Sequence, residues 1–216
     1  MADPKEKFMV TLYARAGSGS AVVEAILAEC DIAFDLVEVP RSGSAYEAFS
    51  KLNPTGKVPA LMLANHSLMT ESAAIAIFLA DLYPQFGLAP LLNSPLRAQY
   101  LRWILYFASD VYAANLRYYY SVRYSVEAGA AEGVKQQSAL ELEDKFLIFA
   151  NALGKGPYVL GEVFSAVDLY IAMIVSWAPD IKVLFAKHPN IERHYALVSA
   201  RPKISPVWER NNMLFS

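Results

Sequence analysis

The sequence has very few residues of the kinds that form covalent cross-links or bind metals. Cys30 is the only cysteine among 216 residues, which excludes an intramolecular disulfide and any metal site built from several cysteines. The three histidines, His66, His188 and His194, are scattered and show no metal-ligand spacing. We therefore expect a protein without a metal, in a reducing and cytoplasmic setting.

The sequence also lacks a strong charge of either sign and a long apolar run. The formal net charge is −2, so overall electrostatics favour neither nucleic acid nor an anionic membrane as a partner. No segment approaches the ~18 consecutive apolar residues of a membrane-spanning helix. The N-terminal MADPKEKF has no apolar segment after its charges that would indicate a secretory signal. With 55% apolar residues, the chain has ample material for a core in one or two domains.

The first part of the chain alternates between strand-like and helix-like patterns. Period-2 alternation and β-forming residues predict strands, and apolar residues at helical spacing predict helices. The predicted order is βαβαββα, which is an α/β arrangement. The predicted elements are strand Phe8–Tyr13, helix Ala21–Cys30, strand Ile32–Val39, helix Ala45–Lys51, strands Ala60–Leu63 and His66–Met69, and helix Ala73–Leu82.

After a segment rich in proline and glycine, the pattern becomes helical throughout. Residues 83–95 contain Pro84, Gly87, Pro90 and Pro95, which is typical of a linker. We expect domains at residues 1–84 and 95–216, joined by a linker at 85–94. The helices expected in the second domain are 96–124, 134–153, 165–178 and 187–200. The S-x-x-D spacing of Ser165 and Asp168 predicts a capping box at the start of the third of these.

The segment Asn53–Leu61, NPTGKVPAL, is the most constrained stretch of the first domain. Its Asn-Pro and Thr-Gly pairs predict a turn, and Pro59 follows inside an apolar run. A Val58–Pro59 bond held cis, at a cost of about 0.5–1 kcal/mol, would let the Val58 backbone pair with an extended peptide. The alternative is a loop that Pro59 breaks. These residues alone favour neither.

Four segments in this order resemble the cytosolic glutathione transferase family. They are NPTGKVPAL, TESAAI at 70–75, GEVFSAVDLYIA at 161–172 and ARPKISPVWER at 200–210. LYARAGSGS at 12–20 is similar to the theta/delta-like and bacterial beta-like branches. The resemblance implies a thioredoxin-like α/β domain followed by an all-helical domain. It also implies a homodimer, glutathione as co-substrate and a small apolar electrophile.

Glutathione carries two carboxylates, one ammonium, two peptide-like bonds and a thiol. By the resemblance, Val58 with Pro59 would present a backbone edge to its cysteinyl unit, and Lys57 would reach its glycyl carboxylate. Ser72 begins a predicted helix, where free N–H groups and the dipole favour a carboxylate, and Glu71 could accept the γ-glutamyl ammonium. The alternatives are that Glu71 and Ser72 merely begin a helix and that Lys57 is a solvated surface lysine.

Three hydroxyl groups are candidates for activating the thiol. A free thiol has a pKa near ~8.5, and lowering it by about two units requires roughly 2.7 kcal/mol of preference for thiolate. A charge-assisted hydrogen bond at a helix N-terminus is of that order. Ser18 follows Gly17 at such a start, as in theta/delta-like enzymes, although it could instead cap the helix. Ser20 is open to the same two roles, and Tyr13 is the third candidate.

Other site residues follow from the beta-like resemblance. Beta-like enzymes carry a cysteine where Gly19 stands, so we expect no mixed-disulfide chemistry through an active-site cysteine. Cys30, at the end of a predicted helix, is expected to be a small buried hydrophobic residue. Asp110 would reach the glutathione of a neighbouring subunit, or else lie on a solvated helix face. Tyr112 and Trp177 would line an apolar electrophile pocket. Arg15 would attract an anionic co-substrate, or point to water.

The predicted reaction is conjugation of the glutathione thiolate to a small apolar electrophile. The alternatives that keep the thiol are glutathione-dependent isomerisation, dehalogenation, and peroxide or disulfide reduction. A further alternative keeps the fold without the chemistry, as an interaction module. The joint presence of Lys57, Val58, Glu71 and Ser72 argues against that last alternative.

Overall fold

The computed structural model describes residues 10–127 and 129–215, which pack as two compact units. One unit comprises the described residues up to Ala89 together with those from Ala200 onward, and the other comprises Pro90–Ser199. The charged N-terminal stretch and the predicted start of the first strand at Phe8 lie outside the described residues. The sequence pattern groups residues 200–216 with the helical domain, whereas their packing groups them with the first unit.

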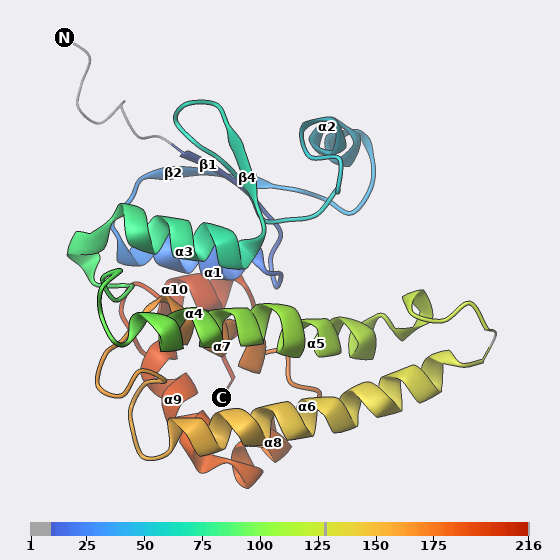
Figure 1. Ribbon diagram of the computed structural model, residues 1–216. Coiled ribbons are helices and arrows are strands. Elements are labelled where there is room, and N and C mark those ends of the chain that lie inside the picture. The colour runs from blue at the N-terminus through green and yellow to red at the C-terminus, as the bar shows by residue number, and fades with distance from the viewer. Residues whose placement is uncertain (1–9, 128, 216) are drawn as a thin grey trace. The chain divides into compact units, whose positions relative to one another are not determined.

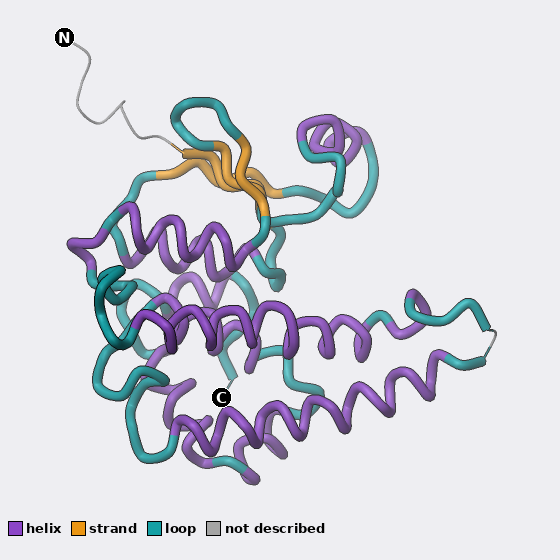
Figure 2. The backbone as a smooth tube through the Cα atoms, in the orientation of Figure 1, coloured by secondary structure: helices purple, strands orange, loops and turns teal. Residues whose placement is uncertain are grey.

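The first unit is built on a mixed four-stranded sheet (Figures 1 and 2). The strands are β1 (Val10–Ala14), β2 (Phe34–Glu38), β3 (Ala60–Met62) and β4 (Leu68–Thr70), in the spatial order β2-β1-β3-β4. Strands β1 and β2 are parallel, whereas β3 is antiparallel to both β1 and β4. With helices α1 (Ser20–Glu29), α2 (Ser44–Leu52) and α3 (Ser72–Leu82), the predicted βαβαββα order is confirmed.

Alternating side chains of β1 serve the two faces of this sheet. Leu12 and its neighbours two residues away are buried, on the face covered by α1 and α3, which lie side by side in Figure 1. Tyr13 points to the other face, where its ring lies 5.4 Å from that of Phe49 in α2. Helix α1 is buried from Ser20 to Leu27, and a short helix, α10 (Ser205–Arg210), also packs against it. The buried Trp208 belongs to this C-terminal helix.

The second unit is all-helical. Its helices are α4 (Arg97–Leu105), α5 (Tyr112–Tyr119), α6 (Ala131–Leu153), α7 (Ala166–Val175), α8 (Ile181–Lys187) and α9 (Pro189–Ser199). The single helix expected over 96–124 is interrupted by a π-helical segment, Tyr106–Val111, and is followed by a 3₁₀ turn at Ser121–Arg123. The sequence pattern does not predict helix α8. Within the described residues, no helix is both long and apolar enough to span a membrane.

Helix α7 forms the core of this unit and begins at the predicted capping box. All ten of its residues are buried. The buried carboxylate of Asp168 accepts from the backbone N–H of Ser165 at 2.9 Å and from that of Val159 at 3.0 Å. His194 Nε2 lies 3.0 Å from the same carboxylate. The predicted pairing of Ser165 with Asp168 is therefore confirmed, and the aspartate also ties down a loop and helix α9.

Candidate active site

Sheet register brings three loops of the first unit to one edge. Tyr13 of β1 pairs with Ala60 of β3, and Ala60 pairs with Thr70 of β4. The loop that follows β1, the turn that precedes β3 and the start of α3 after β4 therefore all emerge at the same end of the sheet. Most of the residues predicted for glutathione binding and thiol activation lie on these three segments or directly beside them: Tyr13, Ser18, Ser20, Lys57, Val58, Pro59, Glu71 and Ser72.

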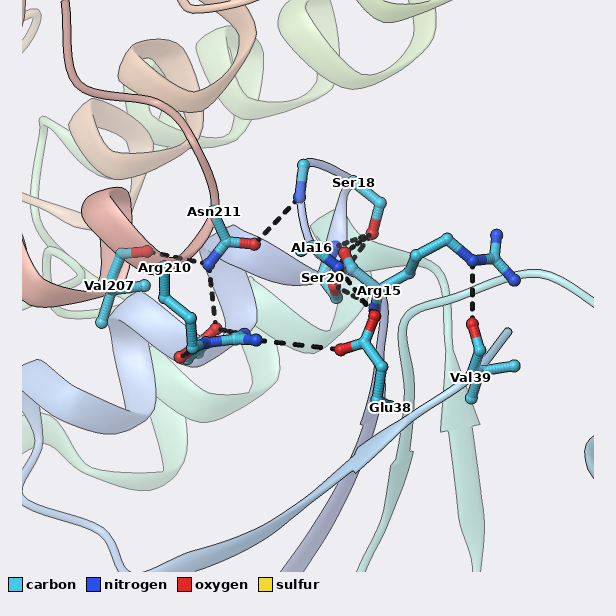
Figure 3. A network of polar contacts seen from close by, with 11 residues as sticks. Arg15, Ala16, Ser18, Ser20, Glu38, Val39, Val207, Arg210 and Asn211 are labelled. Atoms are coloured by element: carbon cyan, nitrogen blue, oxygen red, sulfur yellow. Dashed lines mark hydrogen bonds and ion pairs between the residues drawn. The ribbon is translucent and has the colours of Figure 1, made fainter. Parts of the chain in front are cut away.

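The loop after β1 is closed by the hydroxyl groups of Ser18 and Ser20 (Figure 3). Ser18 Oγ donates to the carbonyl oxygen of Arg15 at 2.7 Å and lies 2.9 Å from Ser20 Oγ. Ser20 Oγ accepts from the Arg15 N–H at 3.1 Å, and the Ser20 N–H donates to Ser18 Oγ at 3.3 Å. Ser20 is fully buried, whereas Ser18 is partly exposed. Of these two residues, only Ser18 is accessible to solvent.

Two further candidates, Tyr13 at the end of β1 and Arg15 in the loop, have structural contacts. Tyr13 packs against Phe49 in a small cluster that also includes Val39 and Ala60. The guanidinium of Arg15 donates to the carbonyl oxygens of Val39 and Pro40, each at 2.9 Å. Arg15 therefore braces the loop against the segment that follows β2.

The turn before β3 is organised by Asn53. Its side-chain amide donates to the Lys57 carbonyl at 2.8 Å, and its backbone carbonyl accepts from the Gly56 N–H at 2.9 Å. The Val58–Pro59 peptide bond is cis, which decides between the two conformations expected from the sequence. Val58 is half-buried and Lys57 is exposed. Among the described residues, none is hydrogen-bonded to the backbone of Val58.

Glycine is required at position 56 for two reasons. Its φ is +63°, in the left-handed region, and a Cβ there would lie 2.3 Å from the hydroxyl of Tyr46. The aromatic ring of α2 can therefore approach the turn only because no side chain is present. This contact fixes the turn against α2.

Glu71 has a strained backbone at the start of α3. Its φ is +68° with ψ +106°, a region that residues other than glycine rarely adopt, and its side chain is exposed. Its carbonyl accepts the first hydrogen bond of the helix, from the Ile75 N–H at 2.9 Å. The N–H groups of the first turn have no carbonyl partner within the helix, and the dipole places partial positive charge there. A carboxylate would be stabilised at this position.

The candidate residues of the second unit form two separate groups. Asp110 lies in the π-helical segment and accepts from Lys145 of α6 at 2.7 Å, with half of its side chain exposed. The rings of Tyr112 and Trp177 meet edge to face with centroids 5.2 Å apart. The hydroxyl of Tyr119 donates to the Trp177 carbonyl at 3.0 Å and fixes the segment after α7.

A separate hollow of about 470 Å³ lies between α6 and α8. It holds none of the predicted site residues. Its lining includes Leu142, Phe146, Leu184 and the exposed ion pair between Lys187 and Glu143.

Cys30 does not supply a reactive thiol. It is buried at the end of α1, and burial, reinforced by the charge of Glu29, raises the pKa of Cys30 to about 11. The protonated thiol is a poor nucleophile. Over the described ranges, no three histidine, cysteine or acidic side chains gather as they would around a metal ion.

Comparison with known proteins gives consistent matches over nearly the whole chain. Residues 20–82 match the model of the glutathione S-transferase N-terminal domain, and residues 112–202 match that of the C-terminal domain. The uncharacterised glutathione S-transferase-like protein YncG of Escherichia coli K12 is 30% identical over 95% of this chain and 100% of its own length. Glutathione S-transferase GstA of E. coli O157:H7 is 27% identical, over 89% of this chain and 94% of its own.

The solved structures agree with these matches. A glutathione transferase homologue from Sulfitobacter, crystallised with bound glutathione, superposes with a TM-score of 0.84 at 26% identity, covering 95% of this chain and 99% of its own. A glutathione transferase from Methylococcus capsulatus gives a TM-score of 0.81 at 25% identity, over 95% and 100% of the two chains. The predicted thioredoxin-like domain followed by an all-helical domain is thereby confirmed.

Proposed function

Because the chain belongs to the cytosolic glutathione transferase family, a family of enzymes, we propose that it conjugates glutathione to a small apolar electrophile. The enzyme acts in the cytoplasm as a homodimer, with glutathione as co-substrate and without a metal. The observation that carries this proposal is the shared sheet edge from which the Ser18 loop, the Val58 turn and the Glu71 helix start emerge. The glutathione-bound Sulfitobacter homologue, at 26% identity, supports the choice of thiol.

The start of α3 binds the γ-glutamyl end of glutathione. Its α-carboxylate lies at the first turn beside Ser72, where N–H groups and the helix dipole stabilise it. Its ammonium pairs with the exposed carboxylate of Glu71. The strained backbone of Glu71 supports this role, because strain of about 1–3 kcal/mol concentrates at ligand-binding positions.

The turn before β3 binds the middle and the far end of the tripeptide. The backbone of Val58 pairs with the cysteinyl unit as an added strand would. The absence of a competing partner for that backbone within the described residues supports this pairing. Lys57, exposed one residue earlier, reaches the glycyl carboxylate.

Ser18 donates the hydrogen bond that stabilises the thiolate. A serine hydroxyl has one hydrogen, so Ser18 must release the Arg15 carbonyl to donate to sulfur. Ser20 makes this exchange feasible, because its N–H donates to Ser18 Oγ at 3.3 Å and its hydroxyl, which donates to the Arg15 carbonyl at 3.1 Å, keeps that carbonyl paired. Ser18 then accepts from Ser20 and directs its own hydrogen outward. Ser20 itself is fully buried, which favours Ser18 as the residue that contacts the ligand.

The test is Ser18→Ala, measured for glutathione binding by calorimetry and for turnover with a model aryl halide. Removing one donor to a developing anion costs roughly a hundredfold in kcat, and we expect binding to remain. Tyr13→Phe is the matched control, since it removes a hydroxyl but keeps the packing on Phe49. Undiminished turnover in Ser18→Ala would move the role to Tyr13 or Ser20. If the unsubstituted protein bound no glutathione, the remaining function would be that of a non-catalytic interaction module.

The other glutathione-dependent reactions are distinguished by their products. Conjugation forms a thioether and consumes the electrophile, as does the first step of dehalogenation, whereas isomerisation and reduction leave no thioether. Disulfide reduction is the least supported of these, because Gly19 replaces the cysteine of beta-like enzymes and Cys30 is buried with a raised pKa.

A further inference from the structure

The loop before Ser18 is held by side chains from β2 and from the C-terminal segment (Figure 3). The Ala16 N–H donates to Glu38 Oε1 at the end of β2, and the Gly17 N–H donates to Asn211 Oδ1 just after α10, each at 3.2 Å. These are the two backbone amides that immediately precede Ser18. The position of Ser18 therefore depends on residues at the far end of the sequence.

Asn211 is itself held in one orientation. It is buried, and its Nδ2 donates to Glu24 Oε2 at 3.1 Å and to the Val207 carbonyl at 2.8 Å. Because both amide hydrogens are used on that side, the oxygen is directed to Gly17. Asn211 is thus a rigid acceptor rather than an adaptable surface side chain.

Arg210 connects the two carboxylates behind this loop. Its guanidinium binds Glu24 of α1 as a fork, with Nε donating to Oε1 at 2.7 Å and Nη2 paired with Oε2. Its Nη1 lies 3.8 Å from Glu38 Oε2. Glu24 is almost fully buried within an apolar helix, so it requires this partner to remain charged there.

The backbone of Gly17 fits this arrangement. Its φ of +69° lies in the left-handed region, which glycine adopts without cost. A small rotation at this residue would swing Ser18 away from its position. A misplacement of about 1 Å in a catalytic group can lower the rate up to a hundredfold. A hydrogen bond that fixes Gly17 would therefore affect the rate through the position of Ser18.

We propose that Asn211, fixed by Glu24 and Arg210, is a positioning residue that sets where Ser18 presents its hydroxyl to the glutathione thiol. This inference rests on the proposed function. It assigns the C-terminal Arg210–Asn211 pair to thiol activation and not only to folding. Neither residue touches glutathione in this scheme, because both act through the backbone of Gly17.

A second arginine–glutamate pair on helix α1 provides a matched control. Arg201, also in the C-terminal segment, binds Glu29 of α1 as a fork, with Nε–Oε1 at 2.8 Å and Nη2–Oε2 at 2.7 Å. Glu29 ends α1, whereas Ser18 precedes its beginning. Removing the Arg201 fork costs stability by the same chemistry, at the end of α1 remote from Ser18.

The experiment compares Asn211→Leu with Arg201→Met in the full-length protein. The pH at which bound glutathione ionises is followed by thiolate ultraviolet absorption, together with kcat, KM and hydrogen exchange of the Ala16 and Gly17 amides. In Asn211→Leu we expect the pKa of the bound thiol to rise by about one unit, a factor of ten in the thiolate equilibrium. We also expect faster amide exchange and a lower kcat with little change in KM for glutathione. Arg201→Met should lower the melting temperature and leave the thiol titration unchanged.

Arg210→Lys gives a milder second variant should Asn211→Leu fail to fold, since it keeps the cation but not the fork, and a smaller rise in thiol pKa is expected. An unchanged thiol titration in the folded variants would overturn the inference, as would an equal shift in Arg201→Met. A parent protein that does not ionise bound glutathione would overturn the proposed function and this inference together. A parent that ionises it with Asn211→Leu unaltered would remove only the inference.

Discussion

The two compact units arrange their candidate site residues by different physical means. In the first unit, sheet register fixes three backbone segments at one edge. These segments carry the predicted ligand contacts, which are the Val58 backbone, the first turn of α3, and the side chains of Ser18, Lys57 and Glu71. In the second unit, Tyr112 and Trp177 meet through their rings, and Asp110 is held by an ion pair to Lys145. Strand topology therefore positions the candidate residues of the first unit, and individual side-chain contacts position those of the second.

This difference matches the two proposed ligands, because glutathione is a fixed co-substrate whereas the electrophile can vary. A backbone contact survives most substitutions, so a site for one fixed co-substrate is well served by strand register and a helix start. Side chains on helices change shape and polarity with single substitutions, which suits a pocket for varied electrophiles. Substitutions that act through the backbone should therefore affect glutathione first, and side-chain substitutions in the second unit should affect the electrophile.

The largest effect is expected in the core of the second unit, where Asp168→Ala should lower the free energy of unfolding by about 3 kcal/mol. The reason is that the buried N–H of Ser165 and the partly buried N–H of Val159 would both lose their acceptor. Thermal or urea unfolding measures the loss. The measurement tests whether the stability of the second unit depends on a single side chain, whereas the sheet edge of the first unit is held by strand register.

Asp180→Ala is the matched control. Asp180 also caps a helix, accepting from the Val183 N–H at 3.0 Å, but it is exposed. Water replaces a lost cap at the surface, so about 1 kcal/mol is expected. Equal losses for Asp168→Ala and Asp180→Ala would show that burial of the aspartate does not set the size of the loss.

Much of the fold was predictable because its patterns are local. Period-2 runs, helical spacing and the S-x-x-D pair indicate the element order and the start of α7. Ser18, Val58 and Glu71 became candidates through motifs at the strand ends together with the resemblance to the glutathione transferase family. Their common edge follows from register, which pattern alone does not give.

Other features depend on contacts that are distant in sequence. The π-helical segment adds a wider turn where Phe107 and Val111 are fully buried, and nothing in its composition marks it. The anchoring of Gly17 by Asn211 spans 194 positions. One signal was present: Glu24 is an acid within an otherwise apolar stretch of α1, and a buried carboxylate requires a cation. The sequence does not say that Arg210 supplies it.

The next largest effect is expected from the backbone of the first unit, in Gly56→Ala. The left-handed φ and the close approach of Tyr46 together should cost about 2 kcal/mol of stability and weaken glutathione binding, because the turn carrying Val58 must shift. Gly87→Ala separates the two causes, since its φ is +68° but a Cβ there would meet nothing within 4 Å. If Gly87→Ala lost as much stability as Gly56→Ala, the close approach of Tyr46 would make no contribution to the loss.

The smallest effect, and the most selective, is expected for Trp177→Leu in the second unit. The substitution removes the indole ring that packs on Tyr112 and that we propose contacts the electrophile. Loss of an aromatic contact of about 1 kcal/mol with the electrophile should raise its KM roughly fivefold. The dissociation constant of glutathione should stay unchanged, because no backbone segment of the sheet edge is altered.

Tyr119→Phe serves as the control, since it removes the hydrogen bond to the Trp177 carbonyl but leaves the ring in place. If glutathione affinity fell in parallel with that of the electrophile, the distinction between backbone-positioned residues in the first unit and side-chain-positioned residues in the second would be wrong. If only the electrophile were affected, substitutions around Trp177 and Tyr112 would be the ones to choose for altering substrate selectivity without disturbing the thiol.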